Sequence, residues 1–120
     1  MKTETPEIEY GIYIDHKKAY VITLTHGVHE EFVDDIAEIK ESKVPGADDH
    51  IQKFYKAVVS RIVHPSRILV FGPAETKLEL RKEIDATKSL KHVREELEKT
   101  DLMDKDQAVH YTTHYFRTKL

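Results

Sequence analysis

The chain has 120 residues, of which 39% are hydrophobic and 34% charged, and it contains no cysteine. This length favours one domain over residues 1–120, since domains cluster around roughly 100–150 residues. Without cysteine, a disulfide scaffold and a thiolate zinc site are excluded. The formal charge of −3 lacks the basic excess of most stand-alone nucleic-acid-binding domains. The first ten residues hold no apolar run, so we expect no signal peptide or membrane anchor, and a cytoplasmic protein.

The N-terminal third of the chain predicts three strands joined by short turns. Residues 8–14 alternate between apolar and other side chains, which is typical of a strand. A polar turn over residues 15–18 leads to a second strand over 19–25, rich in β-branched and aromatic residues. After a turn at His26 and Gly27, a third segment runs from residue 28 to about 39 in an antiparallel meander. Its expected inward side chains are Phe32, Ile36 and Ile39.

A loop over residues 40–48 precedes the clearest helix of the sequence. We expect Asp48 or Asp49 to cap it. It should end at His64, because Pro65 disfavours α geometry in the residue before it. One side of this helix carries an apolar stripe at spacings of three and four, which is formed by Ile51, Phe54, Tyr55, Val58, Val59 and Ile62.

Residues 67–71 form a short apolar run bounded by Pro65 and the Gly72-Pro73 pair. Such a run predicts a strand buried on both faces at the centre of a sheet, parallel to the first strand. A helix from Ala74 to Ile84 should follow and make a parallel crossover. Its candidates for burial are Leu78, Leu80 and Ile84.

The last third of the chain is less clearly patterned. Residues 90–100 fit either a helix or a polar edge strand, and we favour the strand over 93–99. Asp104 and Gln107 resemble a capping box, which opens a helix with the stripe Ala108, Val109, Thr112, Tyr115 and Phe116. The order is therefore three strands, then helix, strand, helix, strand, helix. It predicts an α/β fold, a mixed five-stranded sheet with helices on its faces, in the order of the ribonuclease-H-like fold.

Four segments of the chain resemble a known family. Residues 11–24, 50–62, 68–84 and 98–116 are similar to the middle domain of archaeal and eukaryotic peptide-chain release factors and their Pelota relatives, in the form of short bacterial translational-machinery-like proteins. The most distinctive stretch is GPAETK at residues 72–77. The resemblance implies a ribonuclease-H-like fold, supports the edge strand over 93–99, and implies a translation-related binding role.

One motif of that family is missing. Release-factor middle domains carry Gly-Gly-Gln before the first long helix, where the glutamine places water at the peptidyl-tRNA ester. Here the equivalent residues 43–49 read KVPGADD and hold no glutamine. We therefore expect no peptidyl-tRNA hydrolase activity, no cofactor, and a non-catalytic module associated with the ribosome or another RNA–protein complex.

The alternative is a metal-dependent hydrolase or nuclease on the same scaffold. Two-metal nucleases gather three or four carboxylates around ions about 4 Å apart. Asp15, at the end of the first strand, is plausibly placed for this role, although a turn residue is the simpler interpretation. The end of the central strand reads Phe71-Gly72-Pro73. Asp49, Asp101 or Asp104 would contribute only if loops brought them in.

Two small patches are candidate binding sites. Gly72, Pro73 and Ala74, just before a helix, could offer backbone N–H groups to an anion, with Lys77 as the counter-charge. A purely structural turn is the alternative.

His110 and His114 are spaced four residues apart on the last helix, so they project to one side and could clamp a metal ion. The third ligand of such a site could be either His92 or Asp106. A surface pair of histidines without a metal is the simpler interpretation. Three tyrosines could support a homodimer or be ordinary core residues: Tyr55, Tyr111 and Tyr115.

Overall fold

The computed structural model describes residues 7–26, 31–40, 50–90 and 93–118. Within them the predicted order of strands and helices is confirmed, including the strand over the last third of the chain. The elements are β1 (Glu7–Ile14), β2 (Lys18–His26), β3 (Glu31–Lys40), α1 (His50–Val59), β4 (Arg67–Gly72), α2 (Thr76–Asp85), the 3₁₀ turn η1 (Lys88–Leu90), β5 (Arg94–Lys99) and α3 (Lys105–Thr118).

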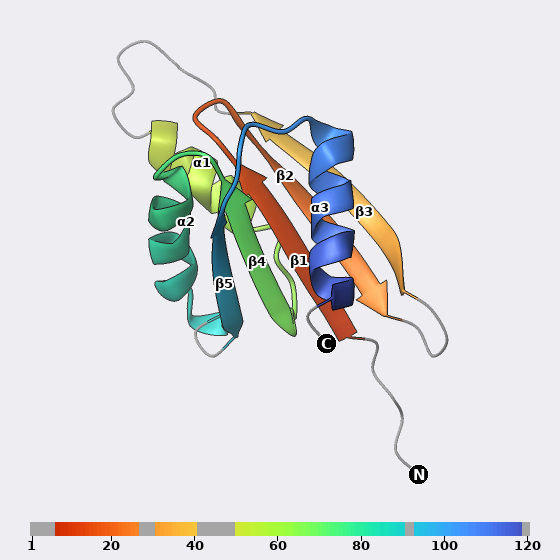
Figure 1. Cartoon of the computed structure of the whole chain (residues 1–120). Coiled ribbons are helices and arrows are strands. Elements are labelled where there is room, and N and C mark those ends of the chain that lie inside the picture. The colour runs from red at the N-terminus through yellow and green to blue at the C-terminus, as the bar shows by residue number, and fades with distance from the viewer. Residues whose placement is uncertain (1–6, 27–30, 41–49, 91–92, 119–120) are drawn as a thin grey trace.

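The five strands form one mixed sheet in the order β3-β2-β1-β4-β5. The meander pairs are antiparallel, whereas β1, β4 and β5 run parallel to one another. Helices α1 and α2 cover one face, and α3 lies on the other (Figure 1). The predicted α/β fold with a mixed five-stranded sheet is thus confirmed, and the apolar run 68–71 lies mid-sheet with at most 1% of any side chain exposed.

Each face of the sheet has its own apolar core. Toward α1 and α2, buried side chains of β1 and β4 meet the predicted helix stripes, in a cluster that includes Ile12, Ile14, Ile68, Val70, Phe54, Tyr55, Val58, Leu80 and Ile84. Toward α3, the cluster contains Tyr13, Tyr20, Ile22, Leu24, Leu69, Phe71, Ala108, Tyr115 and Phe116.

Two predicted core residues are wrong. The side chain of Leu78 is 47% exposed, because it lies two residues from Leu80 and therefore outside the helix face on which Thr76, Leu80 and Ile84 are buried. Ile36 is 37% exposed. It lies opposite Ile22 at the β3 edge, while α3 packs over β1 and β2.

Several boundaries also shift. The first long helix ends at Val59, earlier than predicted, and His64 adopts a positive φ of 48°. Residue 28, the side chain of Phe32 and the proposed caps Asp48 and Asp49 lie outside the described residues.

The capping box at the start of α3 is confirmed in both directions. The backbone N–H of Gln107 donates to Asp104 Oδ1 at 2.8 Å, and the N–H of Asp104 donates to Gln107 Oε1 at 3.0 Å.

Helix α3 lies unusually close to the sheet at one point. A Cβ atom added to Gly11 would lie 2.2 Å from Cγ2 of Thr112, whose side chain is fully buried. Glycine in the middle of β1 therefore allows the helix backbone to approach the strand. The buried hydroxyl of Thr112 has no hydrogen-bond partner.

Candidate functional site

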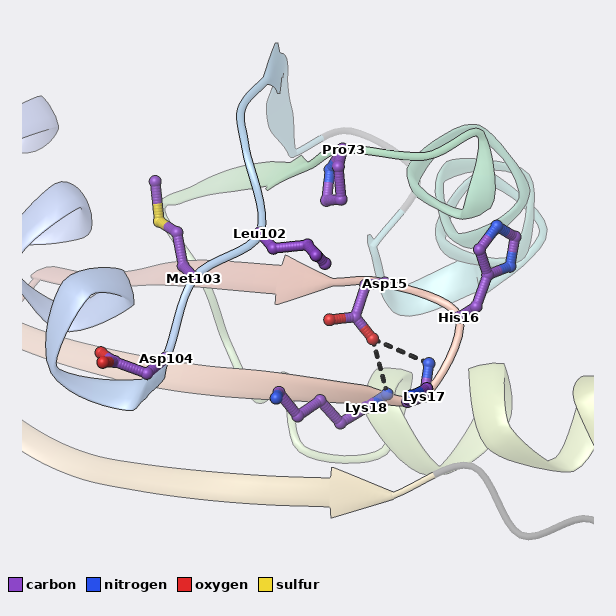
Figure 2. A pocket seen from close by; sticks show the side chains of 8 residues that line it. All are labelled: Asp15, His16, Lys17, Lys18, Pro73, Leu102, Met103 and Asp104. Carbon is purple, nitrogen blue, oxygen red and sulfur yellow. Dashed lines mark hydrogen bonds between the residues drawn. The ribbon is translucent and has the colours of Figure 1, made fainter.

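The parallel strands β1 and β4 end at the same edge of the sheet, and a pocket of about 490 Å³ lies there. Ligands of open α/β sheets bind in the crevice outside the carboxyl ends of the strands. Three segments meet at this pocket: the β1–β2 turn, the end of β4 and the link from β5 to α3 (Figure 2). Its lining consists of Asp15, His16, Lys17, Lys18, Pro73, Leu102, Met103 and Asp104. We call it the carboxyl-end pocket.

Asp15 organises the β1–β2 turn. Its Oδ1 accepts the backbone N–H groups of Lys17 at 2.7 Å and Lys18 at 3.0 Å (Figure 2). Its Oδ2 accepts the Tyr13 hydroxyl at 2.7 Å. Burial by itself would raise the pKa of Asp15, but these three hydrogen bonds outweigh it and the pKa is lowered. The carboxylate is therefore charged, buried and engaged in folding its own turn, which is the simpler of the two interpretations of this residue.

Tyr13 connects this turn to the start of α3. Its hydroxyl donates to Asp15 and accepts the backbone N–H of Met103 at 3.2 Å. Burial, and next the adjoining Asp15 carboxylate, raise the pKa of Tyr13, so the hydroxyl stays protonated. This bridge fixes the link that carries Leu102 and Met103 along the pocket.

The predicted anion-binding residues come together where β4 leads into α2. A Cβ atom on Gly72 would lie 2.1 Å from the carbonyl oxygen of Ile14, so glycine is required there. The ammonium of Lys77 donates to the Ala74 carbonyl at 2.9 Å. Of these residues, Pro73 lines the carboxyl-end pocket. The binding of an anion by this turn stays a prediction.

Basic side chains border the same pocket. Lys17 and Lys18 line it, and Lys18 lies opposite Lys40 in the β2–β3 register. Like charges directly opposite each other destabilise a strand pair. Among the described residues, none of the three lysines has an ion-pair partner within 4 Å.

Sequence reasoning missed the apolar side of the pocket. Leu102 is 71% exposed and Met103 is half-buried. The signal present in the sequence was a Leu-Met pair enclosed by Asp101 and Asp104, but nothing in the sequence places that pair beside the β1–β2 turn.

The histidine pair lies on the outer side of α3. The rings of His110 and His114 are nearly parallel, with centroids 6.3 Å apart. Together with Asp106 they line a second hollow, of about 500 Å³. In the described part of the chain, no three histidine, aspartate or glutamate side chains converge closely enough to hold a metal ion. His92 lies outside the described residues, and metal binding by the pair stays a prediction.

The tyrosines considered for a homodimer bond within the chain. Tyr55 and Tyr115 are 4% and 6% exposed. The hydroxyl of Tyr115 donates to Glu96, and that of Tyr111 donates to Glu98 at 3.3 Å. These contacts hold α3 against the edge strand β5 and give a dimer no support.

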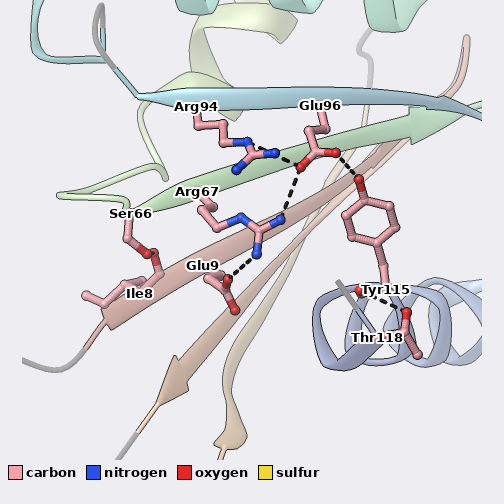
Figure 3. Close-up of polar contacts among 8 residues, drawn as sticks. All are labelled: Ile8, Glu9, Ser66, Arg67, Arg94, Glu96, Tyr115 and Thr118. Atoms are coloured by element: carbon pink, nitrogen blue, oxygen red, sulfur yellow. Dashed lines mark hydrogen bonds and ion pairs between the residues drawn. The ribbon is translucent and has the colours of Figure 1, made fainter. Parts of the chain in front are cut away.

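A polar network extends from Tyr115 across three strands. Arg67 lies between Glu96 at 3.1 Å and Glu9 at 3.4 Å (Figure 3). The hydrogen bond from Tyr115, with help from Arg67, lowers the pKa of Glu96. Burial and the Glu98 carboxylate raise the pKa of Tyr111 to about 12.

Comparison with known proteins shows the fold. No family model matches the chain, and no curated protein matches its sequence. Among solved structures, the chain is similar to Saccharomyces cerevisiae Dom34, described as a translation termination-like factor involved in RNA quality control pathways and interacting with Hbs1. The TM-score is 0.55 at 13% identity, over 91% of this chain and 36% of that one.

A second solved structure, the Aquifex aeolicus PPX-GPPA enzyme, gives a TM-score of 0.44 at 11% identity, over 79% of this chain and 36% of that one. The chain thus spans about a third of the length of both. No helix among the described residues is long and apolar enough to cross a membrane. The chain has a small α/β fold similar to that of a translation termination-like factor.

Proposed function

We propose that this protein is a non-catalytic binding module of the cytoplasm that associates with the ribosome or another RNA–protein complex. Its likeness in fold to a translation termination-like factor supports the association with the ribosome or another RNA–protein complex. The carboxyl-end pocket is the contact surface in this proposal, because it lies where open α/β sheets bind their ligands.

The hydrogen bonding of Asp15 is the observation that supports a non-catalytic role. This residue is the carboxylate best placed to begin a two-metal site, and both of its oxygens accept hydrogen bonds from the chain itself. At the neighbouring strand end, Phe71 and Gly72 offer no carboxylate. A metal-dependent hydrolase of this fold would need free carboxylates at the ends of β1 and β4. Asp15 instead folds the turn that lines the pocket, which favours binding over metal-dependent hydrolysis.

Co-sedimentation with purified ribosomes tests the proposed association. The protein, at micromolar concentration and moderate salt, is layered on a sucrose gradient with and without ribosomes. We expect it to move into the ribosomal or subunit fractions. Recovery at the top of the gradient in both cases would contradict the association.

A nuclease assay tests the non-catalytic half of the proposal. End-labelled RNA and DNA are incubated with the protein in Mn²⁺ or Mg²⁺, beside the Asp15→Asn variant. We expect no cleavage above background from either protein. Cleavage by the wild type that is lost in Asp15→Asn would replace the binding module with the hydrolase.

A further inference from the structure

The two histidines of α3 stand on a firmly held helix. A capping box fixes the start of α3. Thr112, which lies between the two histidines in sequence, is fully buried against Gly11 of β1. The side chains of His110 and His114 are exposed on the outer side of the helix. The backbone beneath the pair is therefore fixed, whereas the two imidazole rings are open to solvent.

Neither imidazole is used to hold the fold together. Among the described residues, side-chain hydrogen bonds to the pair reach only its backbone carbonyls, from the hydroxyls of Thr113 and Thr118. Neither ring has a hydrogen bond or an ion pair in this part of the chain. The rings contact each other, with planes 14° apart and centroids 6.3 Å apart. Both line a hollow of about 500 Å³, so their nitrogen atoms are available to a ligand.

The spacing of the two rings matches what a chelating pair needs. Residues four apart on a helix have Cβ atoms about 5–6 Å apart on the same face. Two imidazole nitrogens at about 2.0–2.1 Å from one ion place the ring centroids about 5–6 Å apart. The centroids of His110 and His114 are 6.3 Å apart, so a small rotation of the side chains brings both nitrogens onto one ion. Because the helix fixes this separation, an ion bound by one ring meets the second at a high local concentration.

The donor atoms decide which ions suit the pair. Imidazole nitrogen is a ligand of Ni²⁺, Cu²⁺ and Zn²⁺, whereas Mg²⁺ and Ca²⁺ take oxygen ligands. Asp106 lies eight residues before His114, about 12 Å along the helix, which is too far to share one ion with both histidines. No third histidine or carboxylate of the described residues converges on the pair. Structural zinc sites use four protein ligands, whereas Ni²⁺ and Cu²⁺ accept nitrogen ligands together with oxygen.

We infer that His110 and His114 together bind one Ni²⁺ or Cu²⁺ ion, with water in the remaining coordination positions. The ion is exchangeable rather than structural, because the described part of the chain supplies only two ligands and α3 is seated without it. The inference does not depend on the proposed association with the ribosome, because the pair lies outside the carboxyl-end pocket.

Isothermal titration calorimetry with NiCl₂ tests the inference on protein prepared without a histidine tag. We expect His110→Asn and His114→Asn each to bind Ni²⁺ at least about tenfold more weakly than wild type, because each variant loses one arm of the chelate. His16→Asn and His64→Asn are the matched controls, since they change exposed histidines outside α3, and should alter the affinity less than about twofold. MgCl₂ should give no binding that depends on the pair. Circular dichroism verifies that each variant is folded.

Nuclear magnetic resonance locates the ion independently. Paramagnetic Cu²⁺ broadens the resonances of nearby nuclei, so substoichiometric Cu²⁺ should first broaden the amide signals of residues 109–115. This order should be lost in the double variant His110→Asn, His114→Asn. Equal Ni²⁺ affinity in wild type and in the two single variants of the pair would overturn the inference. Broadening that begins elsewhere in the chain, or an equal loss of affinity in His16→Asn or His64→Asn, would overturn it as well.

Discussion

The close contact between Gly11 and Thr112 gives the sharpest test of how α3 is seated on the sheet. In Gly11→Ala, the new methyl group would lie 2.2 Å from Thr112 Cγ2 and 2.3 Å from its Oγ1, in a site without free volume. Overpacking of this kind costs about 1–3 kcal/mol. Removing a glycine from a strand returns about 0.5–1 kcal/mol. The difference is about 0–2.5 kcal/mol, and an overlap as close as 2.2 Å places the expected net loss in the free energy of unfolding in its upper part, at about 1–2.5 kcal/mol.

Urea denaturation followed by circular dichroism measures this loss, and a second substitution assigns it. Thr112→Ala deletes the two closest atoms and leaves its Cβ 2.8 Å from the new methyl group. In the Gly11→Ala background it should recover about half of the loss, a coupling of about 1 kcal/mol. Thr113→Ala, on the neighbouring residue, serves as the control. A Gly11→Ala protein as stable as wild type, or one rescued equally by Thr113→Ala, would refute the seating of α3.

Three further predictions concern stability. Val58→Asp should destabilise the fold by more than about 3 kcal/mol, because it places an unpaired charge in a fully buried site; an unchanged melting temperature would show that the α1 face is misassigned. Tyr13→Phe should cost about 1–2 kcal/mol in urea denaturation, because it breaks the hydrogen bonds to Asp15 and Met103; no loss would mean that the bridge is unimportant. Burial and the Asp85 carboxylate raise the pKa of Glu95 to about 7, so the contribution of this residue to stability is greatest below about pH 4.5 and is lost as the pH rises through 7, whereas the lowered pKa values of Asp15 and Glu96 act in the opposite direction in acid. Glu95→Gln should remove about 2–3 kcal/mol of that loss, and pH profiles that coincide with wild type would contradict it.

Most of the architecture follows from local patterns in the sequence. The apolar stripe of α1 predicts which side of the helix is buried, because its spacing gathers the apolar side chains on one face. The uninterrupted apolar run at 68–71 predicts a strand that is buried on both faces. The capping box at Asp104 is a contact between residues three apart and is equally visible in the sequence. Leu78 was misassigned because it lies two residues from Leu80, and the helix face that buries Leu80 and Ile84 leaves it outside.

The candidate site is harder to predict because its parts are distant in the chain. Lys18 faces Lys40 only through the β2–β3 register, which contains a shift between Thr23 and Leu24. Leu102 lies beside the β1–β2 turn because the backbone N–H of the next residue, Met103, donates to the hydroxyl of Tyr13. These contacts depend on tertiary structure, whereas the role of Asp15 as a turn residue depends on its neighbours in sequence and was predictable.

Site-specific photocrosslinking to purified ribosomes examines whether the carboxyl-end pocket contacts the ribosome. A photoreactive phenylalanine analogue replaces Leu102 in one protein and Val63, at the opposite end of the parallel strands, in another. We expect a crosslink from position 102 to a protein component of the ribosome and none from position 63. Crosslinks of equal yield from both positions, or none from position 102, would contradict it.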